Sequence, residues 1–365
     1  MTKLLYTLLF GALCIGLSTA RADTLTYGTY LSATHNIVKQ ALEPYFKTVK
    51  EQTGGDLDFR MFTDSTVVGG PDAIKGVRAG LVDMAFIIPA YDPALMPATA
   101  TFSQLALFTT TSIAGTAATN EMVLLNCEQC QAEWKKLGIK PLSFYATAPY
   151  YLLCTKKVND LASMKDKRIR GTGPWPEWIA AMGAIPVSLA GGETYSAMNR
   201  GTVDCTAGPM AWLNTYGLMD IVKYVMDLPV GSYRPLAFLD MKLNKWDGLS
   251  AEQRNAITSN LASVTASAGW SYKVETEDAV AKARKEGIQF VKPGDDVQPR
   301  YDEFLKSEQQ RFLEVANKRG VKDPQKLLDR YLQILDKWNH IAAGINSKQE
   351  FQQALQEHIF SKVKY

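Results

Sequence analysis

Hydrophobic and polar positions follow the same order twice along the chain. In each copy a helix-like stretch ends at glycine, an apolar strand and a glycine turn follow, and a second helix-like stretch leads through Gly-x-Val-Asp into another apolar strand. The copies cover 54–86 and 183–207. Glycine accepts the positive φ that ends helices, and apolar runs of this kind are typical of buried parallel strands. Each copy therefore predicts a βαβ unit in its own sheet.

Two similar α/β units predict a chain of two lobes. The length of 365 residues agrees, because single cores rarely grow to that size. Ligands of open α/β sheets meet the loops at the carboxyl ends of the strands, so we expect a ligand cleft between the lobes. The pattern turns helical beyond residue 230, with apolar residues at helical spacing through 299–365. We expect these helices to pack on the lobes; a tail that binds a sensor protein is an alternative.

The first 22 residues have the pattern of an export signal. Lys3 provides a short positive start, 4–17 is an apolar run, and Ala20-Arg21-Ala22 matches an A-x-A cleavage site. We expect cleavage after Ala22 and a mature protein in the periplasm. The alternative, a lipid anchor on Cys14, is disfavoured because a bulky leucine precedes that cysteine.

Composition and charge exclude several classes of protein. With 46% hydrophobic and 21% charged residues, the chain is globular rather than disordered or coiled-coil. Without Lys3 and Arg21 of the predicted signal, the 40 basic residues fall to 38, against 37 acidic ones. A nearly neutral mature chain suggests neither nucleic acid nor an anionic membrane surface as a partner.

Four cysteines remain after the predicted signal. An even number in an oxidising compartment indicates disulfides. Cys127 and Cys130 are spaced as a redox pair or half a zinc site, but no second CxxC exists, and the pair falls inside a helical-looking run over 118–137. A local disulfide or two ordinary thiols is therefore favoured. Cys154 and Cys205 lie in strand-like segments and would pair if those strands are neighbours.

Few residues suit catalysis. The chain has three histidines, and His340 and His358 lie in the helical tail. No zinc-protease, nucleophile-elbow, phosphate-loop or calcium-loop motif is present in the sequence. His35 follows a strand that ends at Tyr30, so its ring faces the cleft, lies on the surface or caps a helix. Asp83 and Asp204 resemble an acid–base pair only superficially, because each closes a matching glycine turn and a structural role explains both.

The segment 165–175 carries a sharper signal. It predicts a short strand in which Arg168 and Arg170 share one face, followed by a glycine turn and Trp175. An arginine at the carboxyl end of a strand presents its planar fork to a cleft, where it suits a carboxylate. An arginine that is solvated or paired within the protein is the alternative.

From Leu25 to about Asp336, the order of these segments resembles the periplasmic solute receptors of tripartite ATP-independent periplasmic (TRAP) transporters, the DctP-like family. Each matching stretch is weak alone, but their order and spacing are specific. The stretches are EQTGG at 51–55, GLVDMA at 80–85, KRIR at 167–170, MGAIPV at 182–187, RGTVD at 200–204 and IVKY at 221–224.

The resemblance implies a two-lobed periplasmic-binding-protein-like fold that closes over a small organic acid, with strands crossing between lobes and a long helix spanning both. We expect lobe I to comprise 23–146 and about 233–272, lobe II 147–232 and about 273–320, and 321–365 to form helices packed on the lobes. Such receptors deliver ligand to a membrane permease and perform no chemistry. We therefore expect no cofactor and no metal, a monomer, and TRAP permease subunits as partners.

The resemblance also assigns a ligand anchor. Arg170 matches the arginine that pairs with the substrate carboxylate in this family. A second arginine found in many members is missing from 148–153, and an asparagine of the sialic-acid and C4-dicarboxylate receptors is replaced in 207–209. We therefore expect a monocarboxylate with an apolar or aromatic body. The residues expected to contact it are Arg170, Trp175, Tyr150, Trp212, His35 and Tyr30.

Two alternatives remain open. One is a receptor of the same family for a C4-dicarboxylate or a sugar acid. The other is an exported enzyme that uses the same cleft, with His35 and an aspartate as acid and base.

Overall fold

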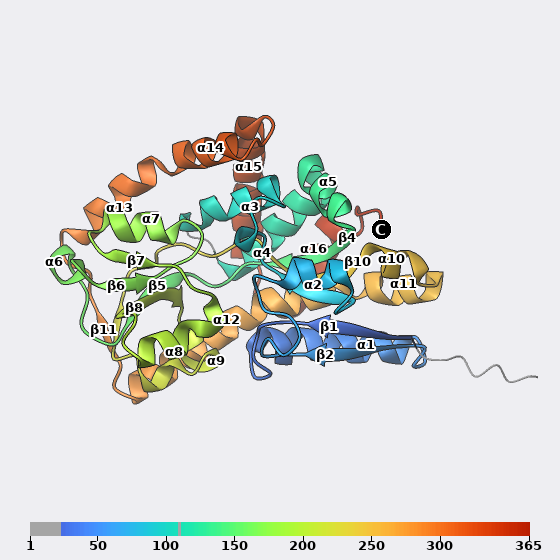
Figure 1. Ribbon diagram of the computed structural model, residues 1–365, viewed down its shortest axis with the longest axis horizontal. Coiled ribbons are helices and arrows are strands. Elements are labelled where there is room, and N and C mark those ends of the chain that lie inside the picture. The colour runs from blue at the N-terminus through green and yellow to red at the C-terminus, as the bar shows by residue number, and fades with distance from the viewer. Residues whose placement is uncertain (1–22, 109–110) are drawn as a thin grey trace, which may run out of the picture.

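The computed structural model describes residues 23–108 and 111–365, which form two separate β-sheets (Figure 1). The first sheet has five strands in the order β2-β1-β3-β10-β4, and the second has six in the order β11-β9-β5-β8-β6-β7. The predicted α/β fold class is confirmed, whereas the predicted cleavage site after Ala22 lies outside the described residues. The strands are β1 (Asp23–Gly28), β2 (Leu57–Phe62), β3 (Met84–Ile87), β4 (Ile139–Tyr145), β5 (Tyr150–Cys154), β6 (Arg168–Arg170), β7 (Ile185–Val187), β8 (Cys205–Pro209), β9 (Tyr224–Met226), β10 (Leu236–Lys242) and β11 (Gln289–Val291).

The repeated pattern forms the same five-element unit in both sheets. In the first sheet it is β1, α1 (Glu43–Gln52), β2, α2 (Ala73–Ala79) and β3; in the second it is β6, α7 (Trp175–Ala181), β7, α8 (Thr194–Asn199) and β8. In each unit the first strand lies between the other two and runs parallel to both. The predicted βαβ units are confirmed, and each encloses one additional strand.

Asp83 and Asp204 occupy equivalent places in the two units. The Asp83 carboxylate accepts the Thr26 N–H at 2.9 Å and the Thr26 hydroxyl at 2.8 Å, and the Asp204 carboxylate accepts the Arg168 N–H at 3.0 Å. Each aspartate thus satisfies a backbone donor of the middle strand where strand pairing begins. This is the structural role that the two matching Val-Asp sequences predict.

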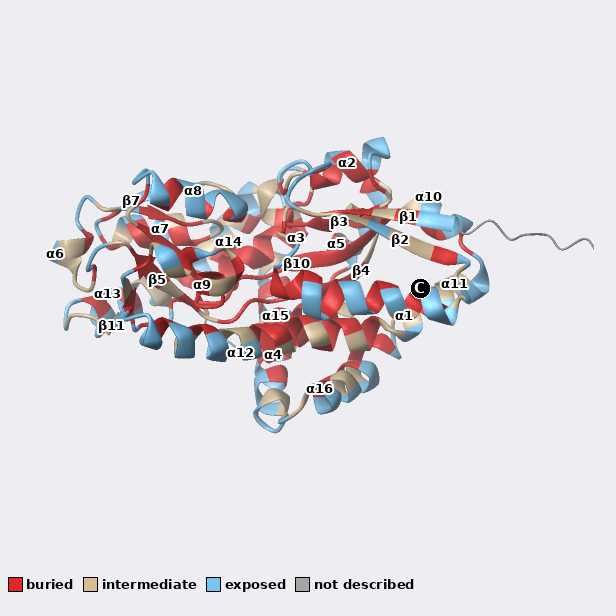
Figure 2. Ribbon diagram, turned by 90° about the horizontal axis from the view of Figure 1, so that it is seen from below, coloured by how far each residue is buried: buried red, intermediate tan, exposed pale blue. Residues whose placement is uncertain are grey.

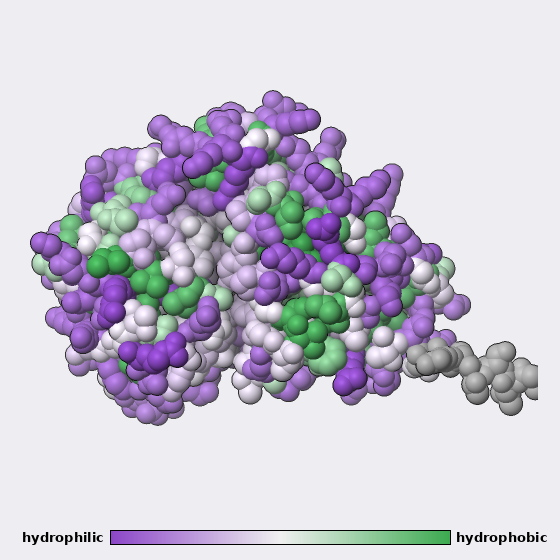
Figure 3. Space-filling view, viewed as in Figure 1, coloured by the Kyte–Doolittle hydropathy of each residue, from purple (hydrophilic) through white to green (hydrophobic). Residues whose placement is uncertain are grey.

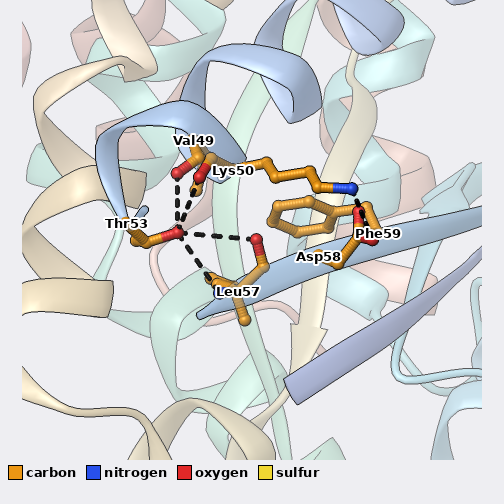
Figure 4. Close-up of polar contacts among 6 residues, drawn as sticks. All are labelled: Val49, Lys50, Thr53, Leu57, Asp58 and Phe59. Carbon is orange, nitrogen blue, oxygen red and sulfur yellow. Dashed lines mark hydrogen bonds and ion pairs between the residues drawn. The ribbon is translucent and has the colours of Figure 1, made fainter. Parts of the chain in front are cut away.

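The glycine stop between α1 and β2 is reinforced by Thr53 (Figure 4). Its hydroxyl donates to the Val49 carbonyl at 3.0 Å and accepts the Leu57 N–H at 3.2 Å, so it joins the end of the helix to the start of the strand. Lys50 and Asp58 bridge the same two elements with a 2.7 Å ion pair. Side-chain hydrogen bonds of this kind satisfy backbone groups that a helix end leaves unpaired.

The remaining helices cover the sheets and form the C-terminal third of the chain. The fully buried α4 lies at their centre, against β4, α12 and α15. No helix in the described part of the chain is both long and apolar enough to cross a membrane. These helices are α3 (Pro97–Thr101), α4 (Ser112–Glu121), α5 (Glu128–Leu137), α6 (Leu161–Met164), α9 (Trp212–Thr215), α10 (Leu243–Gly248), α11 (Ala251–Ser259), α12 (Leu261–Lys285), α13 (Val297–Lys306), α14 (Glu308–Lys318), α15 (Pro324–Ala343) and α16 (Lys348–Leu355).

The helices of the C-terminal tail end next to glycines: α14 ends at Lys318, before Gly320, and α15 ends at Ala343, before Gly344. Figure 3 shows that the face seen in Figure 1 is mostly hydrophilic, with separate hydrophobic patches on the left and on the right of the view.

Three connections join the two sheets. The chain passes from β4 to β5, returns from β9 to β10, and runs along α12. We call each sheet, with the helices packed on it, one half of the molecule, and α12 extends beneath both halves (Figures 1 and 2). On α12, Ser271 accepts a hydrogen bond from Asn36 at 2.9 Å, and Glu275 accepts one from Asn214 at 2.8 Å. The helix is therefore tied to elements near both sheets. The expected lobe boundaries stay a prediction.

The Cys127 region differs from the prediction of one helix over 118–137. After α4 a π-helical turn covers Met122–Asn126, and Cys127 has an extended backbone (φ −125°, ψ 85°). The reason is that Cys127 takes the N-cap position of α5, where its sulfur accepts the Cys130 N–H at 3.1 Å. The two cysteines form a disulfide.

A second disulfide joins Cys154 and Cys205, which lie directly opposite each other on antiparallel β5 and β8. The strands that carry these cysteines are thus neighbours, which is the condition that spacing alone left open.

Glu308 at the start of α14 anchors the C-terminal helices to the end of the 3-10 turn Phe102–Leu107. Its carboxylate accepts the Leu107 N–H at 3.1 Å, and the fully buried Arg234 donates to the carbonyls of Leu105 and Phe108 at 2.5 and 2.9 Å. Burial raises the pKa of Glu308 to about 8, although the charges of Arg234 and Arg311 act in the opposite direction. The helix anchor is therefore a largely protonated carboxyl at neutral pH.

We predict that Glu308→Gln weakens the pH dependence of stability. An unfolded glutamate has a pKa of about 4.3, so the raised folded pKa makes the folded state bind the proton more tightly. This contribution is fully present below the unfolded pKa and is lost as pH rises through about 8. Thermal melts at pH 5 and pH 8.5 should show a smaller decrease in melting temperature for Glu308→Gln than for the wild type, because the glutamine side chain does not titrate. Its amide oxygen can still accept the Leu107 N–H. Glu314→Gln, on the exposed side of α14, is the control and should behave as wild type. An unchanged pH slope in Glu308→Gln would contradict the prediction.

Candidate functional site

An aromatic pocket lies where the two halves of the molecule meet. Its free volume is about 20 Å³, room for about one water molecule. Seven tyrosines and one tryptophan dominate its wall, and Arg170 is the one charged residue among the described lining residues. The lining residues are Tyr30, Ile88, Tyr91, Tyr145, Thr147, Tyr150, Arg170, Thr172, Gly191, Trp212, Tyr216, Tyr233, Leu236 and Tyr272.

Arg170 ends β6 and is only 2% exposed. Its Nε and Nη2 atoms donate to the Leu189 carbonyl at 3.1 and 3.0 Å, its Nη1 atom is buried without a partner, and the guanidinium carbon lies 5.2 Å from the Trp212 ring centroid. No ion pair forms between Arg170 and an acidic residue of the described chain. Because a buried charge without a counterion is costly, this arrangement suits an anionic group in the pocket.

Arg168 provides a contrast two residues earlier. Its side chain is 46% exposed, donates from Nη2 to the Gly201 carbonyl at 2.6 Å, and has Nε 3.6 Å from the Asp204 carboxylate. The strand pattern predicts one face for both arginines, but the structure buries only Arg170, because Arg168 lies at the strand start near the protein surface. The alternative of an internally paired arginine therefore applies to Arg168.

Four of the six residues predicted to contact ligand line the pocket together: Tyr30, Tyr150, Arg170 and Trp212. Trp175 lies behind this wall. Its ring stacks on Tyr150 with centroids 4.3 Å apart and planes at 20°, and its indole N–H donates to the Val230 carbonyl at 2.8 Å. Trp175 therefore fixes the position of Tyr150 instead of lining the pocket itself.

His35 does not line the pocket. Its ring is buried behind two pocket tyrosines, with centroids 5.6 Å from Tyr216 and 6.4 Å from Tyr272, and its Nδ1 accepts the Ile37 N–H at 3.2 Å. Burial lowers the pKa of His35 to about 3, so the ring is neutral at physiological pH. Of the alternatives that the sequence left open, the structure has a capping ring, which accepts a nearby backbone N–H and lies neither on the surface nor in the pocket wall.

Sequence reasoning missed four of the pocket tyrosines: Tyr91, Tyr145, Tyr233 and Tyr272. Tyr145 ends β4, where the chain leaves for the second sheet, Tyr233 lies on the segment that returns from β9 to β10, and Tyr272 lies on α12. The signal available for Tyr272 was only an aromatic residue at helical spacing, which is typical of a core position. The hydroxyls of Tyr145 and Tyr272 hydrogen-bond to each other, and burial raises the pKa of both phenols.

A larger open cavity of about 820 Å³ shares Tyr30 and Tyr216 with the pocket. Its walls come from both halves of the chain, including Asp64 and Gly70 on one side and Glu193 on the other. A Cβ added at Gly192 would lie 3.7 Å from Tyr30, so the two halves approach closely here. This open cavity adjoins the pocket at Tyr30 and Tyr216.

Neither Asp83 nor Asp204 lines the pocket, because both are engaged at strand ends. Within 23–108 and 111–365, no group of three His, Cys, Asp or Glu side chains is arranged to hold a metal ion.

Known proteins resemble this chain over most of its length. The ectoine-binding periplasmic protein TeaA of Halomonas elongata is 22% identical over 341 residues, which cover 90% of this chain and 95% of that protein. A TRAP solute-binding protein of Rhodoferax ferrireducens, solved with copurified benzoate, superposes with a TM-score of 0.77 at 19% identity and covers 88% of this chain and all of that one. A TRAP periplasmic solute-binding protein of Bordetella bronchiseptica, solved with (R)- and (S)-mandelate, superposes with a TM-score of 0.73 at 22% identity, with 86% and 99% covered.

The family model described as bacterial extracellular solute-binding protein, family 7, matches residues 27–315, which include both sheets apart from the first residues of β1. Family members are periplasmic receptors of TRAP transporters that bind solutes and are not enzymes. This chain belongs to the DctP family of TRAP-transporter solute-binding proteins.

Proposed function

We propose that this receptor binds a small organic acid with one carboxylate and an apolar or aromatic body, and delivers it to a TRAP permease. The observation that carries the proposal is the buried Nη1 atom of Arg170, which has no partner and belongs to a pocket walled by aromatic rings. The carboxylate takes the free N–H of Arg170, and the rings cover the body of the ligand.

A single cationic lining residue favours a monocarboxylate over a C4-dicarboxylate. A second carboxylate in this pocket would lose its hydration without gaining a counterion among the described lining residues. The benzoate and mandelate bound by the two structural neighbours agree with this ligand class. The neutral His35 and the engaged aspartates offer no acid–base pair in the pocket, which disfavours the exported enzyme.

Ligand binding acts through closure of the two halves. The pocket wall combines Tyr30 and Tyr91 near the first sheet with Arg170 and Trp212 near the second, so a bound acid contacts both halves only when they are together. Differential affinity of this kind is what shifts a receptor toward its closed state. Since the free volume is only about 20 Å³, an aromatic acid enters only if the halves or the ring walls move.

We predict that aromatic monocarboxylates stabilise the purified protein and that this effect requires Arg170. Benzoate, phenylacetate and mandelate are compared with succinate by thermal shift, because a ligand of the native state raises the melting temperature. Arg170→Met should lower affinity at least about 30-fold in calorimetry, since it removes the charged partner of a buried pair.

Arg168→Met is the matched control, because it removes an exposed arginine from the same strand, and it should bind as the wild type does. Unchanged affinity in Arg170→Met would overturn the assignment of the anchor. A strong shift with succinate and none with the aromatic acids would overturn the substrate class.

We also predict that Gly208→Ala weakens binding by displacing Trp212. A Cβ added at Gly208 would lie 2.3 Å from the Trp212 ring, so the ring must leave its position beside Arg170. Loss of this cation–π contact and of the shaped wall should reduce affinity roughly tenfold. Gly248→Ala is the control, because an added Cβ there meets no atom within 4 Å. Equal affinities of the two variants in calorimetry would show that the position of Trp212 is not important.

A further inference from the structure

Tyr233 is a pocket residue whose hydroxyl is not used by the protein. It lies on the segment that returns from β9 to β10, is 3% exposed, and lines the pocket together with Arg170. Its hydroxyl is buried without a hydrogen-bond partner.

Other pocket tyrosines differ in this respect. Tyr145 is paired with Tyr272, the Tyr216 hydroxyl is paired with Tyr30, and Tyr150 is paired with Thr147. The protein therefore satisfies the neighbouring phenols internally and leaves the Tyr233 hydroxyl free.

The ring of Tyr233 is held in place. It stacks with Trp175 at 5.9 Å and 20° and with Tyr150 at 6.5 Å and 18°. Its backbone N–H donates to the Thr147 hydroxyl at 3.0 Å, and its carbonyl accepts the Thr147 N–H at 3.1 Å. These contacts fix the direction of the hydroxyl before any ligand binds, as a preorganised site requires.

The phenol of Tyr233 is a neutral donor, and Tyr233 lines the same pocket as Arg170. Burial raises the pKa of Tyr233 well above its usual value, while the charge of Arg170 acts in the opposite direction. Between the two residues the wall consists of Trp212, 5.2 Å from the Arg170 guanidinium, and Tyr150, whose ring centroid is 5.6 Å from that of Trp212. A series of ring contacts thus connects Arg170 to Tyr233 along one aromatic wall.

A buried hydroxyl without a partner destabilises a protein, and phenylalanine would fill the same space without that penalty. We propose that the Tyr233 hydroxyl binds a second oxygen of the ligand, so that the receptor prefers aromatic monocarboxylates that carry a hydroxyl or carbonyl oxygen in addition to the carboxylate. This inference rests on the proposed function, in which Arg170 binds the carboxylate.

The test compares two pairs of acids that differ by one oxygen, 3-hydroxybenzoate with benzoate and mandelate with phenylacetate, by calorimetry on the full mature protein. In the wild type the oxygenated acid of at least one pair should bind about tenfold more tightly, the usual effect of one well-placed hydrogen bond. In Tyr233→Phe this preference should fall to within about twofold, with little change for the acid that lacks the oxygen. The ligand-free melting temperature of Tyr233→Phe should equal or exceed that of the wild type, which a merely structural role of the hydroxyl would not produce.

Tyr365→Phe is the matched control, because it removes another buried hydroxyl that lacks a partner, in a residue that does not line the pocket. It should keep the wild-type preference. The inference is overturned if neither pair shows a preference, if none of the four acids binds, or if the preference survives in Tyr233→Phe. Loss of all binding in Arg170→Met together with an unchanged Tyr233→Phe would retain the proposed function and reject this inference alone.

Discussion

The burial of one positive charge in an aromatic pocket is the constraint on which this molecule depends. Arg170 is held by a single carbonyl, that of Leu189, and lacks an acidic partner in the described chain, so its solvation has been removed without full replacement. Such a site gains most from an anion that arrives from outside. The rings of Trp212 and the pocket tyrosines lower the local polarity and strengthen that pairing.

The two repeated units show how one architecture serves two purposes. The strand register makes Gly28 of β1 the counterpart of Arg170 of β6. Gly28 pairs with Ala85, and Arg170 pairs with Thr206. Ala85 lies as far along the chain from Asp83 as Thr206 lies from Asp204. At Gly28 an added Cβ would lie 2.4 Å from Val68, so the first sheet uses this position for close packing. The second sheet places the charge there, and the site is therefore asymmetric although the sheets are alike.

The pocket is also connected to the segments that join the two sheets. Tyr150 begins β5 at the end of the first crossing segment, and Tyr233 lies on the second. The Tyr150 N–H donates to the Gly231 carbonyl of that second segment at 2.7 Å. Tyr272 brings α12 into the same wall. A ligand that contacts these rings touches the connections between the two sheets, and in the proposed function this contact links occupancy of the pocket to closure.

The sequence alone determined the two βαβ units and the family, because these depend on local patterns of glycine, apolar runs and short motifs, and through the family resemblance it singled out Arg170 for the anchor that we propose. Local pattern did not determine which aromatic rings face the ligand. Trp175 lies behind Tyr150 and His35 behind Tyr216, whereas Tyr233 and Tyr272 line the pocket. Only the tertiary structure decided this, because each of these side chains is oriented by packing against segments far away in the sequence. The same long-range packing left the Tyr233 hydroxyl without a partner, a property that no spacing of residues encodes.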